Sequence, residues 1–122
     1  MRAATRTTLI AILALSALIA ATLVSAQQEP PRVALLIGNA AYSAKVGPLK
    51  NPHNDVALLE AALTKLKFKV KVLKDAGYRD MDTAIKRHIA DVAAGGPGAV
   101  SFFYYTGHGA ANPDTKINYL IP

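Results

Sequence analysis

The sequence predicts an α/β domain built on a parallel sheet, and the order of its apolar patterns is the main reason. Strand-like runs at residues 33–37, 68–72 and 99–105 alternate with helical patterns at 51–67 and 80–94. A β-α-β-α-β order implies parallel strands joined by right-handed crossovers. We expect the 33–37 strand at the centre of the sheet and the other two strands at its edges.

The three strands differ in how many of their faces are expected to be covered by other elements. Residues 33–37 read Val-Ala-Leu-Leu-Ile and are stopped by Gly38 and Asn39, which is typical of a central strand covered on both faces. Residues 68–72 alternate apolar residues with lysine, as in a strand covered on one face only. Residues 99–105 carry large apolar or aromatic side chains on both faces, as an interior strand does.

Both helices have start signals in the sequence. Asn51 can cap free backbone N–H groups, Pro52 suits the first helical turn, and Asp80 can cap the second helix. The first helix ends near Lys67, and the Gly-Gly-Pro-Gly run at 95–98 ends the second. The apolar stripe of the first helix is Val56, Leu59, Ala62, Leu63 and Leu66. The corresponding face of the second helix is Ala84, Ile85, His88, Ile89 and Val92.

The far edge of the third strand has little chain left to cover it, because only residues 119–122 remain. An aromatic strand left at a free edge is an aggregation hazard that native domains avoid. We therefore expect further strands after Pro122 in a longer gene product or in a partner chain, and self-association of the present chain alone.

Residues 1–26 have the layout of a secretory signal peptide. Arg2 and Arg6 precede an apolar run at 9–24, and a small-residue site at 24–26 predicts cleavage after Ala26. That run is shorter than the roughly 20 residues that span a membrane, so we expect a secreted or periplasmic protein without a stable membrane anchor. Residues 27–31 then form a proline-containing linker, and 32–122 a single domain that is incomplete at its C-terminus.

Composition excludes several classes of function. The formal net charge is +6, but the alternating Lys65, Lys67, Lys69 and Lys71 are typical of a solvated surface, and no nucleic-acid partner is expected. The three histidines lack metal-ligand spacing, so no metal or other cofactor is expected. A serine hydrolase lacks its nucleophile elbow, since Ser43 lies in a loop and Ser101 inside a strand.

His108 is the candidate for catalysis because of its place in the chain. Ligands of open parallel sheets bind beyond the carboxyl ends of the strands, and His108 follows the third strand there, between Gly107 and Gly109. Glycine neighbours leave the imidazole and the backbone N–H groups accessible. Because imidazole titrates near neutral pH, it can take up and return a proton. His53 and His88 lie on predicted helices, where packing or solvation is the simpler explanation.

Three short motifs occur in a definite order: VALLIGN at 33–39, LKNPHND at 49–55 and FFYYTGHG at 102–109. Together they resemble the large-subunit (p20) half of bacterial caspase-like proteins and metacaspases, and residues 119–122 look like the continuation after the histidine. The resemblance spans residues 32–122. It implies a caspase-like three-layer sandwich with a parallel sheet, of which only the N-terminal βαβαβ half is present.

The resemblance also implies an activity, namely cysteine endopeptidase chemistry of the C14 type on protein or peptide substrates. His108 then corresponds to the catalytic histidine of a His-Cys dyad, and the N–H of Gly109 to an oxyanion-hole donor. Asp55 matches the acidic residue of the metacaspase specificity pocket, which implies cleavage after Arg or Lys. A favourable place in the first turn of a helix accounts for Asp55 equally well.

The sequence departs from this family pattern because it contains no cysteine. Caspase-type enzymes place that nucleophile about 50 residues after the histidine, and here the sequence ends soon after His108. Two hypotheses follow: an endopeptidase domain whose cysteine comes from a complementing C-terminal segment or chain, and an inactive interaction module with a caspase-like fold. Retention of His108 between two glycines favours the endopeptidase.

Overall fold

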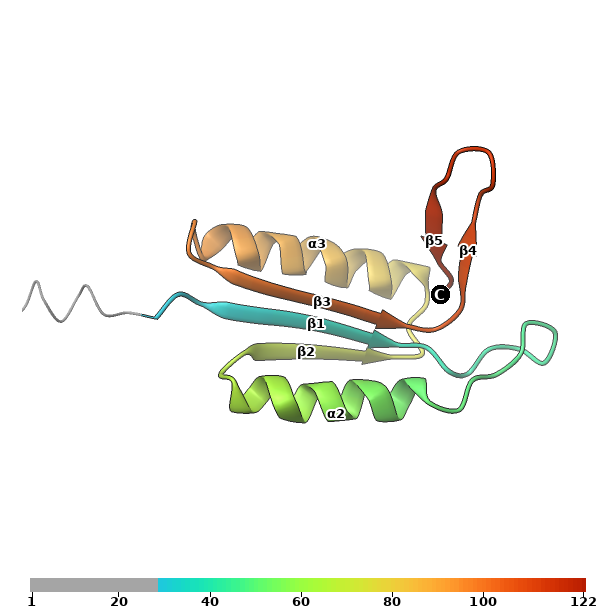
Figure 1. Ribbon diagram of the computed structural model, residues 1–122, viewed down its shortest axis with the longest axis horizontal. Helices are drawn as coiled ribbons and strands as arrows, with labels where there is room; N and C mark the ends of the chain where they lie inside the picture. The colour runs from blue at the N-terminus through green and yellow to red at the C-terminus, as the bar shows by residue number, and fades with distance from the viewer. Residues whose placement is uncertain (1–28) are drawn as a thin grey trace, which may run out of the picture.

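The computed structural model of the protein describes residues 29–122, and its elements follow the predicted order (Figure 1). In chain order they are β1 (Arg32–Gly38), α2 (Pro52–Lys65), β2 (Lys69–Lys74), α3 (Tyr78–Ala94), β3 (Val100–Thr106), β4 (Gly109–Ala111) and β5 (Asn118–Leu120). The short strands β4 and β5 were not predicted. The expected signal peptide, residues 1–26, lies outside the described residues.

The main sheet has the predicted topology. Its order is β2-β1-β3, and both pairs are parallel. Leu35 of β1 is in register with Lys71 of β2 and Phe103 of β3. Helix α2 covers one face of this sheet and α3 the other, which gives three layers (Figure 1).

The core is divided between the two faces of β1, because successive residues of a strand point to opposite sides. Toward α2, the buried residues are Ala34, Leu36, Val56 and Leu63. Toward α3, they are Leu35, Ile37, Ala76 and Met81. The uninterrupted apolar run in β1 therefore supplies both halves of the core, which is the arrangement expected of a central strand.

The predicted helix caps are only partly correct. Asn51 occupies the N-cap position and Pro52 the first turn of α2, but the Asn51 side chain makes no capping hydrogen bond. The prediction that Asp80 caps α3 is wrong, because that helix begins at Tyr78 with Gly77 at its N-cap. The carbonyl of Gly77 accepts the N–H of Met81 at 3.0 Å, and Asp80 lies in the first turn, where its charge suits the helix dipole.

Three residues assigned to the apolar helix faces are exposed instead, namely Ala62, Leu66 and Ile89. Leu66 follows the end of α2 and is 56% exposed. Ile89 of α3 is 62% exposed, whereas Met81, which the predicted face omitted, is buried at 5%. The buried part of α3 therefore lies near the start of the helix, where Met81 packs with Leu35 and Ile37.

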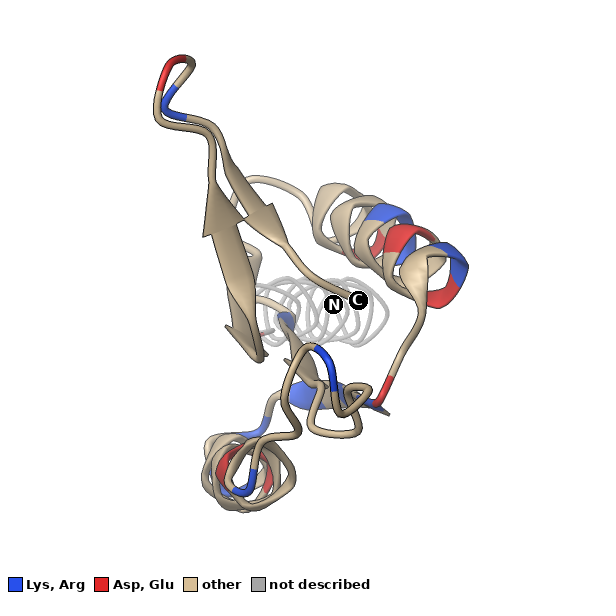
Figure 2. Cartoon of the chain, turned by 90° about the vertical axis from the view of Figure 1, so that its right-hand side faces the viewer, with Lys and Arg blue, Asp and Glu red and all other residues tan. Residues whose placement is uncertain are grey.

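Beyond β3 the chain leaves the main sheet. Strands β4 and β5 pair antiparallel in a hairpin of their own, and this hairpin projects away from the three-stranded sheet (Figures 1 and 2). Within residues 29–122, no strand pairs with the far edge of β3. On that strand Val100 is 41% and Phe103 45% exposed. The third strand therefore has an unpaired edge and exposed apolar side chains, as the sequence predicts.

Among residues 29–122, no helix is long and apolar enough to cross a membrane.

Candidate functional site

Three segments meet at the carboxyl edge of the sheet, which faces the viewer in Figure 2. They are the β1–α2 loop (residues 39–51), the turn after β2 at Asp75, and residues 107–109 after β3. The N–H of Asn39 bonds to the carbonyl of Thr106 at 2.9 Å, and the N–H of Asp75 to that of Gly38 at 3.1 Å. Both bonds extend the strand pairing by one step and hold the three segments together.

His108 is half-buried in this group, and its ring has a defined orientation. Its Nε2 lies 2.7 Å from the carbonyl oxygen of Gly47, and the ring of Tyr42 packs against it edge to face at 4.6 Å between centroids. Because a carbonyl oxygen can only accept, Nε2 carries the hydrogen in the neutral imidazole. The remaining nitrogen, Nδ1, is therefore the basic atom of His108.

Gly47 reaches His108 because of a tight turn in the β1–α2 loop. The carbonyl of Ser43 accepts the N–H groups of Val46 at 3.0 Å and of Gly47 at 2.8 Å. Gly47 has φ of +98°, a conformation that glycine adopts readily and other residues rarely do. The glycine thus allows the backbone turn that directs its carbonyl at the imidazole.

A pair of tyrosine hydroxyls lies beneath the backbone of His108. Tyr42 from the β1–α2 loop and Tyr105 from β3 have their oxygens 3.0 Å apart. A Cβ atom on Gly107 would overlap the Tyr105 hydroxyl and come within 2.6 Å of the Tyr42 hydroxyl. The sequence reasoning singled out Gly107 for leaving the approach to His108 open. In the structure this glycine has a second role, since it leaves room for the two hydroxyls.

The other two predicted site residues also lie at this edge. Gly109 begins β4 next to His108. Asp55 is in the first turn of α2, and its Oδ2 lies 3.5 Å from the hydroxyl of Thr106, a long contact. The fold therefore brings Asp55 to the same strand end as His108 although 53 positions separate them in the chain, as their numbering shows.

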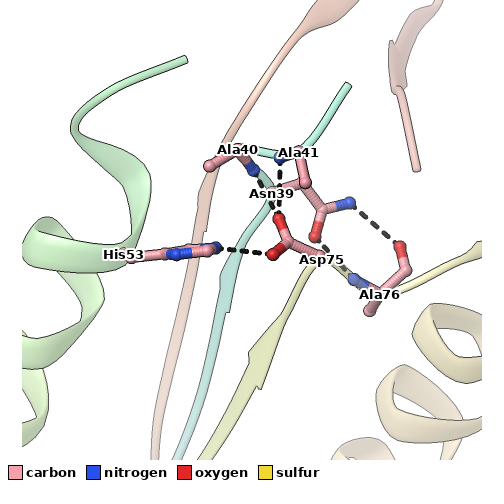
Figure 3. Close-up of polar contacts among 6 residues, drawn as sticks. All are labelled: Asn39, Ala40, Ala41, His53, Asp75 and Ala76. Atoms are coloured by element: carbon pink, nitrogen blue, oxygen red, sulfur yellow. Dashed lines mark hydrogen bonds and ion pairs between the residues drawn. The ribbon is translucent and has the colours of Figure 1, made fainter. Parts of the chain in front are cut away.

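A second polar network lies between β1 and β2 (Figure 3). Asn39, only 2% exposed, donates to the carbonyl of Ala76 at 3.0 Å and accepts the N–H of Ala76 at 2.9 Å. Asp75 accepts the N–H groups of Ala40 at 2.8 Å and Ala41 at 2.9 Å through one carboxylate oxygen. Nε2 of His53 lies 2.9 Å from its other oxygen. This network fastens the start of the β1–α2 loop to the end of β2.

Asp75 is the member of this network that sequence reasoning missed. The hydrogen bonds from Ala40 and Ala41, and then His53, lower the pKa of its carboxyl. Asp75 has φ of +50°, which is uncommon for a residue other than glycine, although Asp and Asn tolerate it better than most. An Asp immediately after an edge strand, at the end of the sheet where ligands bind, was the available signal.

Elsewhere in residues 29–122, the structure offers no comparable site. Nε2 of His88 lies 2.8 Å from the hydroxyl of Ser101, on the α3 side of the sheet. A groove of about 630 Å³ runs between α3 and β2, and His108, Gly109 and Asp55 are not among its lining residues. Within the described part of the chain, no group of three or more His, Cys, Asp or Glu residues could hold a metal ion.

Comparison with known proteins assigns the family. The family model of the caspase domain matches residues 31–122, which include every helix and strand described above. A comparison with curated proteins found no match. The parallel β2-β1-β3 sheet with one helix on each face agrees with the N-terminal half of a caspase-like fold. The chain therefore belongs to the caspase-domain family, peptidase family C14.

Proposed function

We propose that this chain is the histidine-bearing part of a caspase-like cysteine endopeptidase. The observation that carries the proposal is the orientation of His108. Donation from Nε2 to the carbonyl of Gly47 leaves Nδ1 as the base at the edge of the sheet where ligands bind. A catalytic histidine needs a fixed tautomer and a fixed ring orientation, and a second hydrogen bond is the usual means of obtaining both.

The proposed reaction is acyl transfer to a thiol. Nδ1 of His108 takes the thiol proton, and the sulfur attacks the peptide carbonyl carbon. The N–H of Gly109 stabilises the negative oxygen of the tetrahedral intermediate. The C–N bond then breaks, and His108 returns the proton to the leaving amine. Water hydrolyses the resulting thioester with His108 again as base.

The thiol has to come from outside residues 1–122, because the chain contains no cysteine. We place it on a segment encoded beyond Pro122 or on a partner chain. Neither serine of the described region is a substitute: Ser43 holds a loop turn through its carbonyl, and Ser101 bonds to His88 instead of His108. The absence of cysteine favours the second candidate function, an inactive interaction module with the same fold.

One experiment separates the two functions. The coding sequence beyond the Pro122 codon is read, and the protein including any downstream segment is assayed on peptides, together with its His108→Ala variant. The endopeptidase hypothesis expects an Ala-Cys sequence after a further strand, and a rate that His108→Ala lowers at least about 100-fold. The matched control His88→Ala retains activity. A frame that closes without cysteine, together with no turnover, would favour the interaction module. Turnover that survives His108→Ala would contradict the catalytic role proposed for His108.

The same proposal explains the exposed edge of β3. Phe103 and Val100 stay partly exposed in this chain, and burying a large apolar side chain contributes roughly 1.5 to 3 kcal/mol. Further strands would cover this edge. We expect the chain alone to have no peptidase activity and to self-associate, which light scattering measures. A monomer with a cooperative melting transition would contradict the expected need for further strands.

For specificity we propose that Asp55 selects an Arg or Lys side chain before the cleaved bond. A carboxylate at this edge can pair with a basic group. Oδ2 of Asp55 lies 3.5 Å from the hydroxyl of Thr106, the last residue of β3 and two positions before His108 in the chain, which supports the assignment. The completed enzyme is assayed on peptides that differ only at that residue, with Asp55→Asn beside the wild type. Preference for Asp, or a preference that Asp55→Asn leaves unchanged, would refute this assignment.

We further propose export from the cytoplasm, on the basis of the signal-like residues 1–26. Mature protein beginning at Gln27 in the secreted or periplasmic fraction is the expected finding. N-terminal sequencing that returns Met1 would reject it.

A further inference from the structure

The Tyr42–Tyr105 pair remains without a role in the proposed reaction, although its contacts converge on the backbone of His108 and Ile121. The hydroxyl of Tyr105 donates a hydrogen bond to the carbonyl oxygen of His108 at 2.8 Å, and the same hydroxyl lies 2.6 Å from the carbonyl oxygen of Ile121. Tyr42 donates to the Ile121 carbonyl at 2.8 Å and accepts the N–H of His108 at 3.0 Å. The N–H of Ile121 also bonds to the His108 carbonyl, at 3.0 Å. The backbone of His108 is thus held on both sides.

Both tyrosines have to be protonated to make these contacts, because carbonyl oxygens only accept. Burial raises the pKa of Tyr105, and the neighbouring hydroxyl of Tyr42 raises it further. The Tyr105 hydroxyl therefore remains a donor through the neutral pH range.

These contacts have a consequence for the next N–H group in the chain. A trans peptide is planar, so the N–H of Gly109 points opposite to the carbonyl of His108. Hydrogen-bonded and non-hydrogen-bonded pairs alternate in an antiparallel ladder. The bond from Ile121 to His108 makes Gly109 and Leu120, the next pair in register, a non-hydrogen-bonded pair. The N–H of Gly109 is therefore directed away from β5.

We infer that Tyr42 and Tyr105 are positioning residues for the oxyanion donor, because they hold the His108 carbonyl inward and so aim the Gly109 N–H outward. This inference rests on the proposed endopeptidase function and extends it. Gly107 contributes to the same arrangement, because any larger residue at this position would displace the hydroxyls of Tyr42 and Tyr105. Without the tyrosines, the 108–109 peptide can rotate and take the donor away from the reacting oxygen.

The first test reads this one peptide in the 122-residue chain. His108–Gly109 is the only His-Gly step in the sequence, so ¹³C-carbonyl histidine with ¹⁵N-glycine gives a single correlated NMR signal. Solid-state detection gives the same signal if the chain associates. We expect Tyr105→Phe to shift the carbonyl resonance toward that of a free carbonyl and to move or split the Gly109 amide. The matched control is Tyr104→Phe, whose ring packs on the opposite face of β3. A Tyr105→Phe signal identical to wild type would overturn the inference.

The second test uses the completed enzyme and separates positioning from general structural damage. Tyr105→Phe is expected to lower kcat for peptide hydrolysis by about 10- to 100-fold, less than full removal of an oxyanion donor, with KM nearly unchanged. Alkylation of the catalytic thiol by iodoacetamide forms no oxyanion, so its rate should match wild type. His108→Ala should slow both reactions.

Each outcome of the second test has one meaning. Equal loss of hydrolysis and alkylation in Tyr105→Phe would show that the tyrosine acts on His108 or on folding, and would overturn the inference. Unchanged hydrolysis would overturn it as well. A wild-type protein that hydrolyses no peptide would instead refute the proposed function, while the NMR signal would still decide how the 108–109 peptide is held.

Discussion

Two polar networks hold the same edge of the sheet by different chemistry. Between β1 and β2, the carboxylate of Asp75 accepts two backbone N–H groups and lies beside His53. Between β1 and β3, two neutral hydroxyls, those of Tyr42 and Tyr105, contact the backbone of His108 and Ile121. The first network depends on a charge that is partly open to solvent, and the second on protonated groups that are half-buried.

The comparison shows how a loop can be fixed from two sides. The Asp75 network holds the β1–α2 loop at Ala40 and Ala41, where the chain leaves β1, and the next residue, Tyr42, holds it to the backbone of His108. Gly47 of the same loop then contacts His108. In the proposed endopeptidase, the base His108 and the oxyanion donor Gly109 need fixed geometry. The neutral network contacts the backbone of His108 and, through the 108–109 peptide plane, orients the N–H of Gly109.

Gly107→Ala is expected to have the largest effect on stability. Its Cβ would overlap the Tyr105 hydroxyl and approach that of Tyr42 to 2.6 Å, so the tyrosine pair has to separate. Overpacking of this kind typically destabilises by about 1 to 3 kcal/mol, which chemical denaturation measures. Gly109→Ala is the matched control, because its Cβ would meet only the carbonyl of Tyr119 at 3.5 Å. Equal losses in both variants would contradict close packing at Gly107.

Asp75→Gly is expected to have the next largest effect, and it tests the charged network. Glycine adopts φ of +50° without strain, so the substitution removes the carboxylate without adding a steric clash. Loss of the two hydrogen bonds to Ala40 and Ala41 should destabilise by about 1 to 2 kcal/mol. Asp75→Asn keeps an acceptor oxygen and should recover part of this. The control Asp82→Ala removes only the exposed pair with Lys86, which solvent screens, so little change in stability is expected. An Asp75→Gly variant no less stable than Asp82→Ala would show that the network contributes little.

The fold was largely predictable from the sequence because it depends on periodicity. The apolar run of β1 and the alternation in β2 fixed which strand is central, and the observed β2-β1-β3 order confirms it. The wrong details are local. The sequence predicts Asp80 as a cap because capping residues are recognised by type, yet α3 begins about one turn earlier, with Gly77 in extended conformation at its N-cap.

The site was predictable only where one residue carries the signal. His108 stands out between two glycines, and the structure places it at the strand end together with Asp55. Tyr42 and Tyr105 did not stand out, because an aromatic residue in a strand or loop is usually explained by packing. Their role depends on an oxygen-to-oxygen distance across 63 positions of sequence. Asp75 was missed for the same reason, since its partners become neighbours only when β1 and β2 pair.

The pH dependence of stability should show the smallest effects, and it should have opposite directions in the two networks. The pKa of Asp75 is lowered in the fold by Ala40 and Ala41, so its contribution is complete above the unfolded value of about 4 and is lost as the pH falls below it. The pKa of Tyr105 is raised by burial and by Tyr42, so its contribution is complete below about pH 10 and is lost as the pH rises.

Each of these two pH effects on stability is expected to be below about 1 kcal/mol near the start of its pH range, because Asp75 is screened by solvent and Tyr105 is only beginning to ionise in the unfolded chain. The free energy of unfolding is measured from pH 3 to 11. The wild-type value should converge with that of Asp75→Asn at acid pH. Tyr105→Phe should remove the fall in stability at alkaline pH and leave the acid range unchanged. Tyr104→Phe and Asp82→Asn control for the change of residue type. An alkaline limb unaffected by Tyr105→Phe would contradict the assignment of this dependence to the tyrosine pair.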